Sequence, residues 1–405
     1  MAILSPPTIH KPYDGSSKPF NIGVRPLDIK DWIEVDANLP AYLEEKARHY
    51  CDDRHQVIVS EESSTQAQRE VLNLLSEHMC ERYPDIYKKT GSGIDILSGQ
   101  FHVPLDDATL PPLAIAAKLV QEDLVLMSAS PDGWRLVAAS LCFPSAWNLL
   151  KKFGHPLHKV HEPVPGFGTG TRNASMIDRM FDNLRPEQPV MRWNWSLHED
   201  GQLYHPTSHS GTESRFGSGD IGGHVFLRVE RQTLRKLPIS GDIVFTVRIY
   251  LDPLEVLETM PGGDKLAAAI DQQLSAFSVE QESYKGLIDE RKRLSERLRQ
   301  IAASHEGYML KDPQQKLIPL RQKIDKLDEA LVYLIAQRFA IVDKVIEIKR
   351  NANVPASIPE RIEQVVQNAI EISKASGVPE VTIERIWRLL IAETIAYEES
   401  KLVLK

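Results

Sequence analysis

Four cationic side chains in the last quarter of the chain have the spacing expected of an anion-binding pocket. These are Arg321, Arg338, Lys349 and Arg361. Arg338 stands between Leu334 and Ile341 in a run whose apolar pattern assigns this position to the core, and a buried guanidinium is costly unless it meets an anion. Lys349 follows eleven residues later, which at about 100° per residue returns it to within roughly 20° of the same helical face. The spacing predicts a pocket for a small dianion.

A second candidate is a run of three histidines, His155, His158 and His161. Their spacing resembles that of zinc ligands, but Pro156 and Pro163-Val164-Pro165 prevent one helix from presenting all three side chains together. The run therefore argues against zinc. It leaves two interpretations open, one functional histidine or three surface histidines.

The cations belong to a part of the chain with helical periodicity. Apolar residues recur at alternating spacings of three and four from Leu317 to Ile348, which predicts one long amphipathic helix. A break at 351–359 contains two prolines. A second helix runs from Glu360 to Gly377, and a third runs from about Pro379 to the end of the chain. Three such helices bury too little core alone, so we expect this part to form a homodimer.

The front part shows the period-two pattern of antiparallel strands from about residue 120 to 255. Segments 124–130 and 134–143 flank Pro131-Asp132-Gly133, a hairpin signal, and segments 191–197 and 202–206 flank Glu199-Asp200-Gly201 in the same way. Further strands are predicted at 223–234 and 242–251. Helices are predicted at 65–83, 265–277 and 287–304. These patterns together predict an α+β domain built on an antiparallel meander.

Composition limits the class of protein and its partners. The 405 residues are 42% hydrophobic and carry a net charge of −8, which argues against nucleic acid as the main partner. The sequence contains no apolar run long enough to span a membrane and no recognisable secretory signal. Its three cysteines form no CxxC pair, so we expect neither a disulfide framework nor an iron–sulfur cluster, and we expect a cytoplasmic location.

The charge is unevenly distributed along the sequence. From Asp312 onward the 14 Lys and Arg residues balance the 14 Asp and Glu residues, so the whole net charge of −8 precedes that point. This difference, with the change of periodicity, predicts two domains, at 1–305 and 312–405.

The helical part resembles the type II, all-helical chorismate mutase family over about residues 313–403. The resemblance rests on the segment 320–329, on Gln337-Arg338 and on Ile348-Lys349. It implies an intertwined dimer of three-helix chains that needs no cofactor and binds the two carboxylates and the ether oxygen of chorismate. It also implies a role for six residues: Arg338 and Lys349 in their own site, Arg321 reaching into the partner's site, Arg361 at a carboxylate, Thr394 lining the pocket and Glu398 at the ether oxygen.

Two positions depart from the pattern of that family. The typical mutase has a carboxylate directly after the arginine of the second helix, whereas here Ile362 follows Arg361, as in the related isochorismate–pyruvate lyases. Bacterial members usually carry glutamine where this chain has Glu398. The family's chemistry is pericyclic, so cations in a dry pocket suffice. Three substrates are left open: chorismate for a chorismate mutase, isochorismate for an isochorismate–pyruvate lyase, and aminodeoxychorismate for an aminodeoxychorismate mutase.

The front part resembles the alpha subunit of haem-dependent oxidative N-demethylases over about residues 18–300. The resemblance rests on five segments in order: 142–147, 161–166, 192–195, 228–238 and 284–286. It implies a PAS-like antiparallel sheet domain that holds b-type haem and oxidises small amines with dioxygen. In that family the electrons come from flavin and iron–sulfur partner subunits; this chain lacks their motifs, so an external reductase is implied.

The resemblance also implies roles for single residues. His161 becomes the candidate axial ligand of the haem iron, since a neutral imidazole is a standard haem ligand. Arg228 and Arg231 become candidates for the haem propionates or the substrate, and Asn194 and Trp195 for the pocket wall.

Taken together, the two resemblances predict a bifunctional enzyme made of an amine-oxidising haem domain fused to a chorismate mutase-like domain. Such fusions usually join consecutive steps, so a shikimate-derived amine is the expected oxidation substrate. One alternative is a haem sensor module that regulates the mutase, and another is a front domain that has lost haem and serves as a dimerisation or binding module. Turnover and electron input distinguish the enzyme from the sensor.

Overall fold

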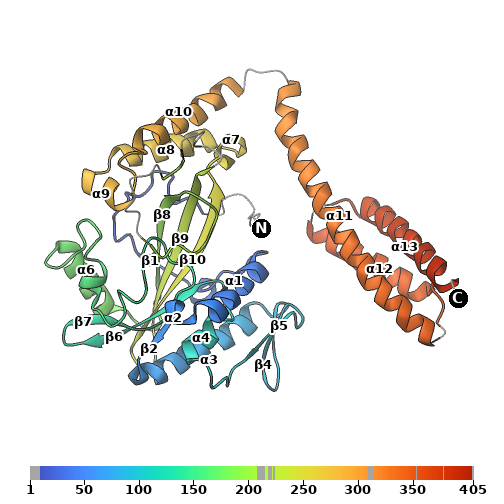
Figure 1. Ribbon diagram of the computed structural model, residues 1–405, viewed down its shortest axis with the longest axis horizontal. Coiled ribbons are helices and arrows are strands. Elements are labelled where there is room, and N and C mark those ends of the chain that lie inside the picture. The colour runs from blue at the N-terminus through green and yellow to red at the C-terminus, as the bar shows by residue number, and fades with distance from the viewer. Residues whose placement is uncertain are drawn as a thin grey trace. The chain divides into compact units, whose positions relative to one another are not determined.

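The computed structural model describes residues 10–207, 215–217, 221, 224–308, 313–352, 354–376 and 378–403. The chain divides into two compact units, Met1–Leu310 and Lys311–Lys405 (Figure 1). The first unit is built around an antiparallel sheet, and the second consists of helices. No helix in the described ranges is long and apolar enough to cross a membrane.

Seven strands form the main sheet of the first unit. In spatial order they are β1 (Arg25–Pro26), β8 (Val190–His198), β9 (Phe226–Lys236), β10 (Ile243–Pro253), β6 (Asp123–Ser130), β7 (Gly133–Ser140) and β2 (Ile58–Ser60). All neighbouring pairs are antiparallel. The hairpin expected at Pro131-Asp132-Gly133 is confirmed, because it joins β6 to β7 and Gly133 has a φ of 99°, which favours glycine.

The order of the five central strands gives the expected PAS-like arrangement. The β6–β7 hairpin lies beside β10, the last strand in the sequence, and β8, β9 and β10 follow one another as a meander. The connection from β7 to β8 contains two short helices, α5 (Leu157–Val160) and α6 (Arg172–Asn183). Among these five strands, β10 and β6 pair although they are far apart in the sequence, whereas the other neighbouring strands are consecutive.

The second predicted hairpin is wrong in its second half. Val190–His198 forms a strand as expected. The described residues 202–206 do not form the second strand, and they make one isolated bridge, between Ser145 and His205. This segment is held against 143–145 instead. The His205 N–H donates to the carbonyl of Pro144, and the Arg228 guanidinium donates to the carbonyl of Leu203. Tertiary hydrogen bonds thus replace the ladder that the local pattern suggested.

Helices and short strands cover both faces of the sheet. Leu157, Phe167, Ile177 and Phe181, from α5, α6 and the loop between them, pack on one face, called here the α5–α6 face. The opposite face packs against two sets of helices. One set is α1 (Leu39–Asp52), α3 (Thr65–Arg82) and α4 (Pro112–Ala117); the other is α7 (Val256–Thr259), α8 (Gly263–Ser275) and α10 (Arg291–Tyr308) (Figure 1).

The remaining elements of the first unit are short. They are 3-10 helices at Ile29–Asp31 and Glu62–Ser64, α2 (Arg54–Val57), α9 (Val279–Tyr284) and a three-stranded sheet of β3 (Tyr87–Lys89), β4 (Gly93–Ile96) and β5 (Phe101–Pro104).

The second unit consists of α11 (Pro313–Ala352), α12 (Pro359–Ser376) and α13 (Glu380–Val403). The long helix and the two shorter ones expected from the periodicity are confirmed. Within its own chain α11 buries Val342 and Ile346, which are 8% and 2% exposed. Its predicted apolar stripe is exposed instead, at 55–68% for Ile324, Leu327, Leu331, Leu334, Ile341 and Ile348.

Candidate functional sites

Arg338 and Thr394 join two helices of the second unit. The half-buried guanidinium of Arg338 on α11 donates from Nη1 to Oγ1 of Thr394 on α13 over 2.5 Å. Burial lowers the pKa of Arg338 and the nearby charge of Glu398 opposes that shift, so the side chain stays cationic. Arg338 thus reaches the core side of α11, although Leu334 and Ile341 in the same predicted stripe are exposed.

Lys349 and Glu398 form a second polar pair between the same helices. Lys349 Nζ donates to Oε2 of Glu398 over 2.6 Å and to the carbonyl of Ala356 over 2.8 Å. Both side chains are largely buried, at 15% and 8% exposed. The Lys349 ammonium group therefore holds the Glu398 carboxylate and the loop between α11 and α12 through hydrogen bonds.

The buried face of α13 differs from ordinary helical core. Ile391, Thr394 and Glu398 are spaced by three and four residues, which places them on one helical face, and all three are buried. A helix normally presents only apolar residues on such a face. The hydroxyl and the carboxylate lie there beside Arg338 and Lys349, so the structure brings four of the six predicted residues together.

The other two cations lie apart from this group within a single chain. Arg321 is exposed on α11, seventeen residues before Arg338. Arg361 is exposed in the first turn of α12, and its Nη1 donates to Oε1 of Gln364 over 2.7 Å. One chain alone therefore gathers two cations, a hydroxyl and a carboxyl group.

In the first unit, a polar cluster occupies the α5–α6 face of the sheet. Its centre is Glu230 on β9, which is 8% exposed. Its Oε2 accepts hydrogen bonds from Asn194 Nδ2 over 3.1 Å and from Gln232 Nε2 over 2.8 Å. Asn194 pairs with Glu230 directly across β8 and β9, so both side chains point to the same face.

Four cations interact with this buried carboxylate, and one of them is Arg228, whose Nε lies 3.9 Å from Glu230 Oε1. Burial lowers the pKa of both Lys152 and Lys285 to about 8, and Glu230 opposes each shift. The pKa of Arg192 is lowered by burial and supported by the same carboxylate. Arg192 keeps a buried Nε that has no hydrogen-bond partner among the described residues. The cluster thus contains at least one buried N–H donor that has no acceptor among the described residues.

His161 lies at the end of α5 beside these cations. Burial, with the charges of Lys152 and Arg192, lowers its pKa to about 4, so the imidazole is neutral near pH 7. Its ring contacts Phe167 at 6.4 Å between centroids. Across the described ranges, no three His, Cys, Asp or Glu side chains are grouped so as to hold a metal ion. His161 is therefore an isolated neutral imidazole next to a cationic group.

The remaining predicted residues of this unit do not converge on one site. Arg231 points to the opposite face, where it forms an ion pair with Glu34 over 2.9 Å and donates to the carbonyl of Trp32. Trp195 also lies on that face, in a hydrophobic core. Arg228 shares the face of Asn194 and forms an ion pair with Glu230, and its fully buried guanidinium also donates to the carbonyls of Leu203 and Phe143. Strand alternation therefore places these two candidates for the haem propionates or the substrate, Arg228 and Arg231, on opposite faces of the sheet.

The residues around His161 fit haem in two respects. A neutral imidazole is able to ligate iron, and the cations Lys152, Arg192 and Lys285 are suited to propionates, since Arg192 Nε lacks an acceptor of its own. Sequence reasoning missed Lys152 and Glu230. The signal that identifies Glu230 is its position directly opposite Asn194, which requires the strand register.

The chain therefore joins a PAS-like sheet domain, with a neutral histidine beside buried cations, to a three-helix domain with a polar site between its helices. The family model described as haem-dependent oxidative N-demethylase, alpha subunit-like, matches residues 23–294, and the model for chorismate mutase type II matches residues 320–399. The chain belongs to the haem-dependent oxidative N-demethylase alpha subunit-like family, and its C-terminal domain belongs to the type II chorismate mutase family.

Curated relatives match the C-terminal domain. A chorismate mutase of Methanocaldococcus jannaschii is 31% identical over 88 residues, which are 22% of this chain and 89% of that protein. A "T-protein" of Enterobacter agglomerans is 34% identical over 86 residues, 21% of this chain and 23% of its own length. A bifunctional chorismate mutase/prephenate dehydratase of Aquifex aeolicus is 30% identical over 88 residues, 21% of this chain. The chain spans about a quarter of the length of these last two.

Proposed function

We propose that the protein is a bifunctional enzyme whose helical domain rearranges chorismate to prephenate and whose PAS-like domain binds b-type haem and oxidises a small amine. The observation that carries the first half is the buried pairing of Arg338 with Thr394 and of Lys349 with Glu398. Membership of both domain families supports the combination. The fusion itself supports an amine derived from the shikimate branch as the second substrate.

The mutase site is proposed to be completed by a second copy of the chain. Arg338 and Lys349 would bind the dianionic substrate in their own chain, and Arg361 would hold a carboxylate at the start of α12. The partner subunit's Arg321 would supply a further cation. The exposed stripe of α11 supports this homodimer, because apolar side chains that are 55–68% exposed in one copy would become buried between two.

The proposed rearrangement needs charge and exclusion of water, with no nucleophile. One carbon–oxygen bond breaks and one carbon–carbon bond forms within the substrate, while negative charge develops on the ether oxygen. The guanidinium of Arg338 and the ammonium of Lys349 would stabilise that charge in a site from which water is largely excluded. Glu398 would donate a hydrogen bond to the ether oxygen only when protonated, since an ionised carboxylate is an acceptor alone.

In the PAS-like domain, His161 is the proposed iron ligand. Because its pKa is low, the imidazole is neutral near pH 7 and one ring nitrogen is free to bind iron. Lys152, Arg192 and Lys285 would neutralise the haem propionates. When bound, haem would supply the oxidation of the amine by dioxygen, with electrons from an external flavin or iron–sulfur reductase. Glu230, held by Asn194 and Gln232, would offer a carboxylate to the cationic form of an amine.

Two measurements on the purified full-length protein test the proposal. An absorption spectrum should show a Soret band that shifts on reduction and with carbon monoxide, and chorismate should be converted to prephenate. A colourless protein that added haemin does not restore would refute the haem half. Pyruvate released from isochorismate, with little prephenate from chorismate, would instead favour the lyase that Ile362 suggests. Haem binding without amine turnover in the presence of a reductase would favour a sensor.

A further inference from the structure

Three side chains that meet on the face of the sheet opposite to α5 and α6 each keep a buried nitrogen atom without a hydrogen-bond partner among the described residues. These atoms are Trp32 Nε1, His78 Nε2 and Arg235 Nε. Trp32 follows the 3-10 helix Ile29–Asp31, His78 lies on α3 and Arg235 lies on β9. A buried polar atom without a partner is costly, because it has lost its hydrogen bonds to water and has gained none in return. Three of them in one place indicate a site for a group that accepts hydrogen bonds.

Ring contacts bring these three side chains, called here the Trp32 cluster, together. The Arg235 guanidinium lies over the Trp32 indole, with its central carbon Cζ 4.3 Å from the ring centroid. The His78 imidazole contacts the same indole in an edge-to-face arrangement, with 5.5 Å between the ring centroids. Trp32 is fully buried, whereas His78 and Arg235 are only partly buried. The cluster is therefore accessible from solvent beside His78 and Arg235.

Arg235 brings a positive charge that no acidic side chain contacts. Among the described residues its guanidinium has no hydrogen-bond acceptor and no ion-pair partner. Burial lowers the pKa of Arg235 and the charge of Glu70 opposes that shift, so the guanidinium stays cationic. The carboxylate oxygens of Glu70 themselves accept the backbone N–H groups of Ile239 and Ser240, over 2.7 and 2.9 Å. The charge of Arg235 thus has no counter-ion in direct contact.

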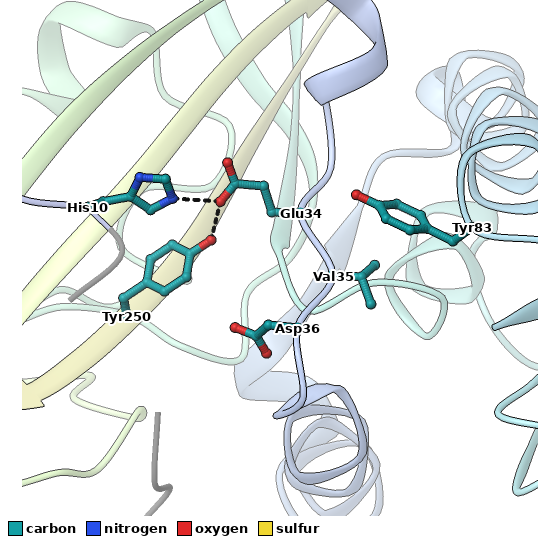
Figure 2. A pocket seen from close by; sticks show the side chains of 6 residues that line it. All are labelled: His10, Glu34, Val35, Asp36, Tyr83 and Tyr250. Carbon is teal, nitrogen blue, oxygen red and sulfur yellow. Dashed lines mark hydrogen bonds and ion pairs between the residues drawn. The ribbon is translucent and has the colours of Figure 1, made fainter. Parts of the chain in front are cut away.

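The acidic side chains next to Trp32 in the sequence have other partners. Glu34, two residues further on, accepts hydrogen bonds from His10 Nε2 over 2.8 Å and from the Tyr250 hydroxyl (Figure 2). Asp31, the preceding residue, is exposed and lies 4.0 Å from the guanidinium of the last residue of α3. Neither carboxylate accepts a hydrogen bond from the indole N–H, so the chain's nearest acids leave the cluster unsatisfied.

His78 adds a neutral donor to the cluster. Burial, with the charges of Arg235 and Arg82, lowers its pKa to about 4, so the ring carries a single N–H near pH 7. With that proton on Nε2, His78 donates one hydrogen bond and adds no second positive charge to that of Arg235. The cluster therefore combines one cation with two neutral N–H donors.

We propose that the Trp32 cluster binds the carboxylate group of a small organic acid. The two oxygens of a carboxylate accept about four hydrogen bonds. The cluster provides four donors, which are Trp32 Nε1–H, His78 Nε2–H, and the Nε–H and one Nη–H of Arg235, the last two in the fork that matches a carboxylate. The single negative charge would balance Arg235. The site is separate from the His161 cluster, because Arg235 lies on the opposite face of the sheet from Glu230.

Other ligand classes satisfy the cluster less well. A cation would be repelled by Arg235, and a phosphate dianion would bring a second negative charge for which the cluster has no cation. Water would satisfy the donors but would leave the charge of Arg235 without a counter-ion. Chloride would balance that charge, but its single atom does not match the two parallel N–H groups of the guanidinium fork.

The test is a titration of the full-length protein, carrying isotope-labelled tryptophan, with sodium acetate at constant pH. The Trp32 indole N–H resonance, assigned with Trp32→Phe, should move as acetate binds, because the N–H gains an acceptor. Sodium chloride at equal ionic strength is the control for unselective charge effects. Arg235→Gln should weaken acetate binding by at least about tenfold, since it removes both the charge and the fork. Because the resonance reports on Trp32 alone, acetate bound elsewhere does not contribute.

Lys236→Gln is the matched control, because Lys236 is the next residue of β9 and its ammonium lies over the Trp134 ring on the other face. It should change acetate affinity by less than about twofold. The proposal is overturned if acetate moves the Trp32 resonance no more than chloride does, since the donors would then hold water or any anion. It is also overturned if Arg235→Gln binds acetate as the wild type does. Thermal unfolding of each variant identifies any loss of fold. If Arg235→Gln is unfolded, Arg235→Lys, which keeps the charge and loses the fork, decides the matter and should also bind more weakly.

Discussion

The Glu398→Gln substitution tests the chemistry of the proposed mutase site. Glu398 is 6% exposed, and its Oε2 accepts a hydrogen bond from Lys349 Nζ over 2.6 Å. The ether oxygen of chorismate only accepts hydrogen bonds, so ionised Glu398 is unable to donate to it and repels its developing charge. Glutamine has nearly the same shape, keeps an oxygen for Lys349 and carries a permanent N–H donor.

The expected magnitude follows from the single proton involved. Because donation to the ether oxygen requires one protonated carboxyl group, kcat/KM of the wild type should rise on acidification, by at most about tenfold per pH unit. The Glu398→Gln variant should be nearly flat between about pH 5 and about pH 8. The variant replaces an ion pair with a hydrogen bond from the Lys349 ammonium to a neutral amide oxygen, which should destabilise the helical domain by only about 1 kcal/mol.

The assay is the conversion of chorismate to prephenate, followed by chromatography across that pH range. Glu399→Gln is the matched control, because Glu399 is the next residue of α13 and is exposed. Its pH profile should coincide with that of the wild type. If Glu398→Gln also follows the wild-type profile, the placement of Glu398 at the ether oxygen is refuted.

Three further substitutions test the remaining assignments. His161→Ala should lose the Soret band or change its spin state, as absorption spectra of the variant and the wild type would show. Arg338→Ala should lower kcat/KM by at least about a hundredfold at every pH, because no proton replaces the missing cation, and a pH-dependent recovery in the same assay would contradict this role. Leu334→Glu should convert the proposed dimer to a monomer in light scattering, because Leu334 is 58% exposed in a single copy. Ile239→Glu, at a position 77% exposed in the sheet domain, should leave the oligomeric state unchanged.

Local sequence patterns determined most of the secondary structure. The turn at Pro131-Asp132-Gly133 is specified within a few residues, because glycine adopts the positive φ that the hairpin needs. The three C-terminal helices follow from periodicity and from the proline-rich break before Pro359. Arg338 stood out as a candidate because a charge in an apolar pattern is visible without a structure. Each of these signals comes from residues close together in the sequence, and backbone geometry alone determines how such residues lie relative to one another.

Long-range contacts decided which polar groups meet. The segment 202–206 has the alternation of a strand, but hydrogen bonds to residues near Pro144 and from Arg228 hold it outside the sheet. Arg228 and Arg231 are close in sequence yet point to opposite faces, so only one of them shares the face of Glu230. Strand register, which depends on partners far along the chain, sets these outcomes.

The hydrogen bonds of Glu34 are the clearest case of a feature that only the tertiary structure shows. His10, Glu34 and Tyr250 lie far apart in the sequence and carry no common motif, yet one carboxylate accepts hydrogen bonds from the other two side chains. The sequence determined which elements form and that Arg338 and Lys349 are candidate ligands. The fold decided the burial of each charge and its neighbours, because both depend on the packing of segments such as those of Glu34 and Tyr250, which are 216 residues apart.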